Sequence, residues 1–358
     1  MNRTAGSNVN ATLRTIVALA GTIGVLGCAH VPAQRVTRDR FDYASALGDS
    51  WKRQTLANVV RIRYADAPVF LNVSSVINSY TLSGTVNAGA TLAEKPSTNS
   101  AVVGGNASWS NTPTVTYQPL TGDQFTKNLL RPIPPAAVLQ LVQAGWPVEL
   151  IFATSVRAIN RLQNQVGLAG GDPLFFQLVS ILARIQRSDA IGFKIEGPKD
   201  AETVVMVITG EEAGAVREDG QAARKLLGLD PDAAEFNVTF GAVPRNTREV
   251  AMLTRSMFEI MLELSAGIDV PPPHLEGQVL PLRAGEGRGE EFKPLVHIRS
   301  GPRAPGDAYA AVPYEGYWFW IDTRDIASKR LFTFLMILFN LSESGQAQAA
   351  PVVTIPAH

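Results

Sequence analysis

Hydrophobic and polar residues alternate along residues 80–117, and this is the clearest pattern in the chain. Apolar residues, aromatic residues or glycine recur at every second position from Tyr80 to Leu92 and again from Ala101 to Trp109. The positions between them are mostly Thr, Ser and Asn. Because successive side chains of a strand point to opposite faces, the alternation predicts two strands with one apolar and one polar face. Turn-forming residues lie between them, so we predict one long β-hairpin.

Most of the remaining chain has helical periodicity, interrupted by short strand-like runs. Asp172 and Asp325 are predicted N-caps, and Asn246 with Glu249 resembles a capping box. Strands and helices alternate without βαβ regularity, so the predicted class is α+β, with mixed helices, short antiparallel strands and a long protruding β-hairpin. Helices are predicted at 42–63, 135–144, 147–162, 173–187, 213–227, 250–264 and 326–341, and strands at 69–73, 192–196, 203–209, 236–240, 295–298, 317–321 and 352–355.

An apolar stretch near the start of the sequence covers residues 16–28. It is shorter than the roughly 20 residues that a membrane-spanning helix needs, but it has the length of the apolar region of a secretory signal. Arg3 and Arg14 precede it, and no acidic residue lies before Cys28. Its end, Val25-Leu26-Gly27-Cys28, resembles the lipobox of bacterial lipoproteins.

This resemblance implies cleavage between Gly27 and Cys28 and acylation of Cys28, for example with palmitate. Ala29, in place of an aspartate after the cysteine, implies the outer membrane, with the mature chain facing the periplasm. Two alternatives stay open, a cleaved soluble secretory peptide and an uncleaved anchor with an incidental cysteine. Residues 61–71 and 113–120 also resemble uncharacterised proteobacterial envelope lipoproteins, which implies a location but no activity.

Without residues 1–27 the chain has 32 − 2 = 30 basic and 32 acidic side chains, a net charge of −2. We therefore expect no nucleic-acid partner, because such binding needs a basic excess. Cys28 is the only cysteine, so no disulfide forms within the chain. We expect a signal peptide (1–27), an acylated tether (28–40), a part with helix, strand and hairpin (41–119), an α+β body (120–345) and a tail or edge strand (346–358).

Catalytic motifs are scarce. We interpret His297 as a structural histidine and His274 as a solvated loop residue. Two groups of carboxylates have ordinary turn and cap roles but offer acid–base pairs as an alternative. We expect no metal, no cofactor and no enzymatic activity, and we keep an envelope hydrolase using carboxylates or His297 as an alternative. The carboxylate groups are Asp322 with Asp325, and Asp230 and Asp232 with Glu235.

The aromatic run 314–320 predicts a strand with Trp318 and Trp320 on one face and Tyr317 and Phe319 on the other. One face packs on the core, and the other is a candidate stacking platform for a sugar or peptide. We expect the interaction surface to include these two tryptophans and three hairpin residues, Val86, Ala90 and Trp109.

We predict a lipid-anchored, non-enzymatic envelope protein that contacts membrane lipid through Cys28 and binds an envelope protein or associates with itself. The alternative is an oligomeric outer-membrane pore or secretion component that uses the hairpin 80–117. Its first arm is long enough to cross a bilayer, but a lone hairpin would leave backbone groups unpaired in lipid, so crossing requires an oligomer. A hairpin lying on the body and a mobile glycine-rich loop are the other interpretations.

Overall fold

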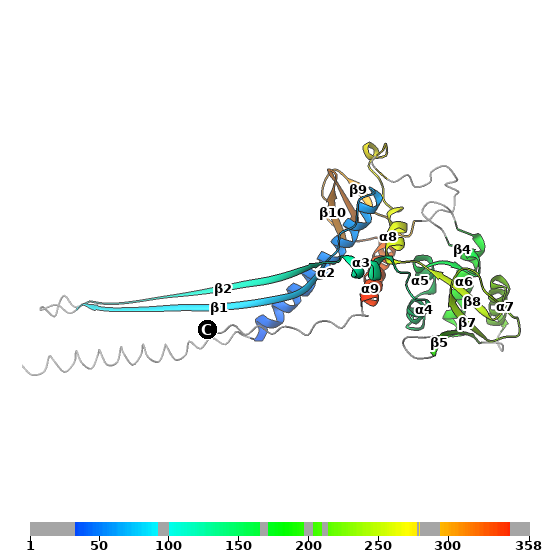
Figure 1. Cartoon of the computed structure of the whole chain (residues 1–358). Coiled ribbons are helices and arrows are strands. Elements are labelled where there is room, and N and C mark those ends of the chain that lie inside the picture. Colours follow the sequence, from blue (N-terminus) through cyan, green and yellow to red (C-terminus); the bar gives the residue numbers. More distant parts are fainter. Residues whose placement is uncertain are drawn as a thin grey trace, which may run out of the picture. The chain divides into compact units, whose positions relative to one another are not determined.

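The computed structural model (Figure 1) describes residues 33–91, 100–164, 171–196, 203–209, 214–277, 279 and 294–343. Two compact units, Met1–Arg53 and Gln54–His358, divide the chain, and their boundary lies inside helix α2 (Ala33–Arg63). Residues 33–40, which we predicted to belong to a polar tether, are part of this helix. The Arg38–Asp42 ion pair, one helical turn apart, favours the longer helix.

A mixed six-stranded sheet lies in the second unit, in the order β4-β3-β8-β7-β6-β5. Strands β7 and β8 are parallel, and the other neighbours are antiparallel. Five of the six residues of β8 are buried, as expected for a central strand covered on both faces. The strands are β3 (Val156–Ile159), β4 (Leu162–Gln163), β5 (Ile191–Glu196), β6 (Thr203–Ile208), β7 (Glu235–Phe240) and β8 (Glu249–Thr254).

Helices α4 and α6 pack on this sheet. The Asp172 carboxylate accepts the Leu174 N–H, and the Asp325 carboxylate accepts the Ser328 N–H, so both predicted N-caps are confirmed. The helices are α3 (Gly122–Phe125), a π-helix (Thr126–Leu130), α4 (Pro135–Gln143), α5 (Val148–Ser155), α6 (Pro173–Arg187), α7 (Gly214–Leu227), α8 (Met257–Ser265), a 3-10 turn (Pro272–His274) and α9 (Ile326–Glu343).

A second, three-stranded antiparallel sheet has the order β10-β11-β9. Its strands are β9 (Arg299–Gly301), β10 (Ala310–Tyr314) and β11 (Tyr317–Ile321). Glu315 and Gly316 join β10 to β11 with φ of 44° and 77°. Two successive positive φ values match the two-residue turn that suits the twist of a hairpin. The predicted strand 317–321 is confirmed, strand β10 was not predicted, and the strand predicted at 295–298 begins instead at Arg299.

Two predicted helices are partly strands. The capping box belongs to Ser256 and Glu259, which start α8, whereas the preceding residues form β8. Asn246 instead accepts the Arg248 N–H in a turn, and the Glu249 carboxylate accepts the Arg245 N–H. A helical stripe cannot be told from a strand followed by a helix when both are apolar.

The helix predicted over 147–162 ends at Ser155 for a different reason. Asn160 and Arg161 have φ of 42° and 74° and form the two-residue turn between β3 and β4. The Asn160 side chain accepts the Ala251 N–H at 2.7 Å and donates to the Leu227 carbonyl at 2.7 Å. These buried hydrogen bonds stabilise the turn, and only the tertiary structure supplies them.

The α+β class is confirmed. Strands β1 (Leu71–Thr91) and β2 (Ser100–Pro119) pair with each other in a third, two-stranded sheet (Figure 1). Strand β1 begins before the predicted limit at residue 80, and strand β2 ends after the predicted limit at residue 117. Residues 92–99, which join them, lie outside the described residues, and so does the strand predicted at 352–355. The protruding hairpin stays a prediction.

Candidate interaction surface

The strand pair β1–β2 is antiparallel from Leu71, opposite Pro119, to Thr91, opposite Ser100. One bulge, between Val73 and Ser75, interrupts the register. Neither strand contains Asp, Glu, Lys, Arg or His. In the part of the chain that the structure describes, no third strand joins this sheet. Each strand therefore has one edge whose backbone groups no other described strand pairs.

Residues directly opposite each other in an antiparallel pair share a face, so the register assigns each residue type to a face. Val86 lies opposite Gly105, Ala90 opposite Ala101, and Leu82 opposite Trp109. The three predicted hairpin residues Val86, Ala90 and Trp109 therefore share one face. This apolar face consists of Leu71, Val73, Val76, Asn78, Tyr80, Leu82, Gly84, Val86, Ala88, Ala90, Ala101, Val103, Gly105, Ala107, Trp109, Asn111, Pro113, Val115, Tyr117 and Pro119.

The opposite, polar face is rich in hydroxyl and amide side chains. Thr85 and Asn87 on β1 and Asn106, Ser110 and Thr114 on β2 are exposed. The polar face consists of Asn72, Ser75, Ile77, Ser79, Thr81, Ser83, Thr85, Asn87, Gly89, Thr91, Ser100, Val102, Gly104, Asn106, Ser108, Ser110, Thr112, Thr114, Thr116 and Gln118.

Part of the apolar face is also exposed. Val76 and Val115 are register partners and are 40% and 38% exposed, and Tyr117 is 58% exposed. Apolar groups in water are unfavourable by about 25 cal/mol per Å² of surface. A contiguous apolar face on an uncharged strand pair is therefore a candidate contact surface.

Trp318 and Trp320 lie on the opposite face of β11 from Phe319, which is fully buried. This confirms the predicted alternation, with Phe319 on the core side. The two tryptophans are half-buried, and the Trp320 ring lies over Gly301, where an added Cβ would be 3.2 Å from it. Their face offers aromatic surface, but Trp320 already packs against its own sheet.

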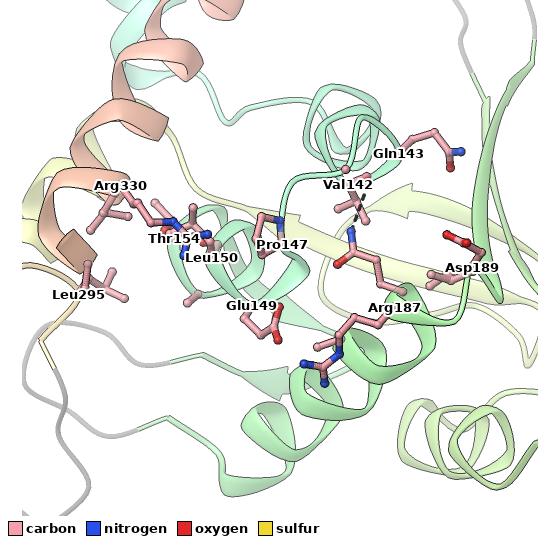
Figure 2. Close-up of a pocket in the computed structure, with 17 residues that line it drawn as sticks. Val142, Gln143, Pro147, Glu149, Leu150, Thr154, Arg187, Asp189, Leu295 and Arg330 are labelled. Atoms are coloured by element: carbon pink, nitrogen blue, oxygen red, sulfur yellow. Dashed lines mark hydrogen bonds between the residues drawn. The ribbon is translucent and has the colours of Figure 1, made fainter. Parts of the chain in front are cut away.

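A cavity of about 830 Å³ lies beside helices α4, α5, α6 and α9 (Figure 2). The Gln186 amide sits in its wall and donates to the Val142 and Trp146 carbonyls while accepting the Val148 N–H. This side chain therefore joins α6 to the α4–α5 turn. Among the residues that the structure describes, neither a histidine nor a cysteine lines the cavity. The charged lining residues are Glu149, Arg187, Asp189 and Arg330.

His274 is buried, which corrects our prediction of a solvated loop residue. Its Nδ1 lies 2.7 Å from the Tyr64 hydroxyl, and its ring packs edge-on against Tyr64 and Tyr317. Burial raises the pKa of Tyr64 to about 12. The neighbouring Tyr314 hydroxyl donates to Asp66. Proline-rich sequence before His274 suggested a loop, but the 3-10 turn places the ring inside this aromatic cluster.

His297 is half exposed, with Nε2 2.7 Å from an Asp269 carboxylate oxygen. Its backbone N–H donates to the Ser328 hydroxyl, which itself donates to Asp325 at 2.6 Å. Ser328 is 2% exposed and caps α9 together with Asp325. The hydroxyl is thus committed to the helix cap and is not aligned with the imidazole as a serine nucleophile would be.

The two predicted groups of carboxylates do not form acid–base pairs. Asp322 lies 3.2 Å from both Arg299 and Arg324, and hydrogen bonds from Arg324 lower the pKa of Asp322 to about 2. Asp325 caps α9. Asp322 is therefore an ionised carboxylate paired with cations, and Asp325 is a helix cap; both roles are structural.

The second group is likewise separated. Asp230 accepts the Asp232 N–H in a turn and pairs with Arg248 at 3.3 Å. Glu235 pairs instead with Lys194 at 3.0 Å. Within the described ranges, no three His, Cys, Asp or Glu side chains are arranged to hold a metal ion.

The predicted lipidation and cleavage sites, Cys28 and Gly27, lie outside the described residues. Of the helices among the described residues, none combines the length and apolar character needed to cross a membrane. Comparison with protein families, curated proteins and solved structures found no match.

Proposed function

We propose that the protein is a lipid-anchored, non-enzymatic component of the cell envelope that associates with further copies of itself through strands β1 and β2. The observation that carries this proposal is the composition of the strand pair. Neither strand contains a charged side chain, and apolar and polar positions are divided between the two faces of the pair.

The backbone of the pair supports self-association. Proteins commonly protect exposed strand edges with lysine, inward charges, proline or a covering element. Strand β1 contains neither charge nor proline, and β2 contains only Pro113 and Pro119. An isolated two-stranded sheet is at best marginally stable in water. A second copy offers strands of the same length and composition, so edge-to-edge pairing satisfies the backbone groups of both edges and joins the apolar faces of neighbouring copies into one continuous surface.

The lipobox-like sequence supports the location. An acylated Cys28 would hold every copy at one membrane, and two or more acyl chains anchor stably. Confinement to a surface raises the local concentration of the strand pairs and so favours association. A hydrolase is less well supported, because His274, His297 and Asp322 all have structural partners.

Matched aspartate variants test self-association. Val86→Asp and Ala90→Asp add a charge to the apolar face, and the neighbouring Thr85→Asp and Thr91→Asp add the same charge to the polar face. We expect the apolar-face variants to lose assembly, measured as mass in detergent by light scattering, and the polar-face variants to keep it. Equal masses for all four variants and the wild type would overturn the proposal.

A separate variant tests the anchor. Cys28→Ser removes the atom that would be acylated, so we expect it to abolish incorporation of labelled palmitate and release the chain from the membrane fraction. Label that persists in Cys28→Ser would contradict acylation at this residue.

A further inference from the structure

The apolar face divides into two sections. In the outer section, where residues 82–91 pair with 100–109, every apolar-face position is Leu, Trp, Val, Ala or Gly. In the inner section, the same face contains Asn78, Asn111 and Pro113. The amide side chains therefore mark a limit beyond which the face is free of polar groups.

The length of the outer section matches a lipid bilayer. Each strand contributes ten residues to it, from Leu82 opposite Trp109 to Thr91 opposite Ser100. A tilted strand crosses the hydrocarbon layer with about 9–11 residues. A surface for another globular protein has no reason to match this length.

The two ends of the outer section have the residues that favour a membrane–water interface. Tyr80 and Trp109 share the apolar face at its inner end, and aromatic residues concentrate at such interfaces. In the sequence, Glu94 and Lys95 follow shortly after Thr91. Charged residues are unfavourable within hydrocarbon, so two charges this close in the sequence to the end of the span are consistent with a span that ends near Thr91.

The polar face of the outer section cannot lie in lipid as well, because it carries Ser83, Thr85, Asn87, Asn106 and further hydroxyl groups. It has to face water. Two strands alone would also leave their outer backbone groups unpaired in hydrocarbon, which is unfavourable by several kcal/mol per group. A ring of copies meets both requirements, because each edge pairs with the next copy and the polar faces surround a water-filled interior.

We infer that residues 82–91 and 100–109 cross a lipid bilayer in such a ring, with the apolar face against lipid and the polar face against water. This inference rests on the proposed self-association. It adds that the apolar face of the assembly contacts the hydrocarbon layer. Residues 71–80 and 111–119 lie outside the hydrocarbon.

Labelling at single introduced cysteines tests the inference. The full chain carries one cysteine at Val86, Ala88 or Ala90, or at Thr85, Asn87 or Gly89, and the thiol is labelled with an environment-sensitive fluorophore after reconstitution into phosphatidylcholine vesicles. Wild-type protein, whose only cysteine is Cys28, gives the background labelling at that residue. Val76→Cys is the matched control, since it replaces the same residue type on the same face outside the proposed span.

We expect a period of two in the quenching. Lipids with a spin label on the acyl chain should quench the fluorophore at 86, 88 and 90, and aqueous iodide should quench it at 85, 87 and 89. Position 76 should escape the lipid quencher.

Other patterns overturn the inference in distinguishable ways. Oligomers in which neither quencher reaches 86, 88 and 90 would place the apolar face against protein, so lipid crossing would fail while self-association stood. Lipid quenching at position 76 as strong as at 86 would contradict the limits of the span. Monomers with iodide quenching at every position would contradict both the inference and the proposed function.

Discussion

The six-stranded sheet and the strand pair β1–β2 differ in how far the chain itself pairs and covers their strands. Four strands of the large sheet have neighbours on both sides, and helices α4 and α6 pack on it. The strand pair has two strands and, among the described residues, no third. A sheet that pairs and covers its strands within one chain is stable alone, whereas a lone pair needs a further partner.

Charges show the same difference. The body keeps Arg255, which is 1% exposed, by pairing it with Glu263 at 3.8 Å and with the Ala153 and Thr154 carbonyls. Burial lowers the pKa of this guanidinium, and Glu263 opposes that shift. The strand pair contains no charged residue at all. The body compensates its buried charges internally, whereas the strand pair contains none, as the proposed contact with lipid requires.

The largest effect on stability is expected within the body. Glu263→Ala leaves a buried guanidinium without its carboxylate, a change that lowers the free energy of unfolding by about 3–5 kcal/mol. Denaturant titration measures it. Lys194→Ala is the control, because it removes an exposed pair with Glu235 and is expected to change stability by less than about 1 kcal/mol. Equal losses in both variants would show that burial does not distinguish the two pairs.

A smaller, pH-dependent effect is expected at Asp322. Its folded pKa is lowered to about 2 by Arg324 hydrogen bonds, below the ordinary value of about 3.9. The ionised carboxylate therefore stabilises the fold above pH 4, and this contribution is lost as the pH falls through 2. We expect Asp322→Asn to melt below the wild type at pH 6, with the difference shrinking toward pH 2. A difference that is constant with pH would exclude the ion pair as its cause.

The smallest effect on folding is expected from the strand pair. Val86→Asp lies outside both larger sheets, so the body should keep its melting temperature, with a change in stability within about 0.5 kcal/mol. Circular dichroism measures this, alongside the loss of assembly proposed above. A clear fall in melting temperature would mean that the strand pair supports the body directly.

Local patterns predicted much of this structure, and tertiary contacts decided the rest. The alternation after Tyr80 and the Asp172 cap depend on neighbours in sequence, and both strands and cap are present. Glu249 was assigned to a capping box because the apolar positions of β8 continue into α8 with only Arg255 and the Ser256 cap between them. His274 could be placed only by its contact with Tyr64, which lies 210 residues away in the sequence.

The candidate surface was predictable for the same reason. A period of two places Val86 and Ala90 on one face of β1 and Trp109 on the apolar face of β2 before any partner is known. The register added what periodicity could not, namely that Trp109 lies opposite Leu82 and that the outer section is ten residue pairs long.

Backbone amide hydrogen exchange of β1 and β2 tests the central claim most directly. In a lone antiparallel pair, about half of the amides of each strand point inward and are hydrogen-bonded, and the other half point outward. We predict that in assembled wild-type protein nearly all amides of residues 82–90 are protected, whereas in Val86→Asp about half of them exchange at the rate of an unstructured peptide. Half-protection in the assembled wild type would contradict pairing between copies.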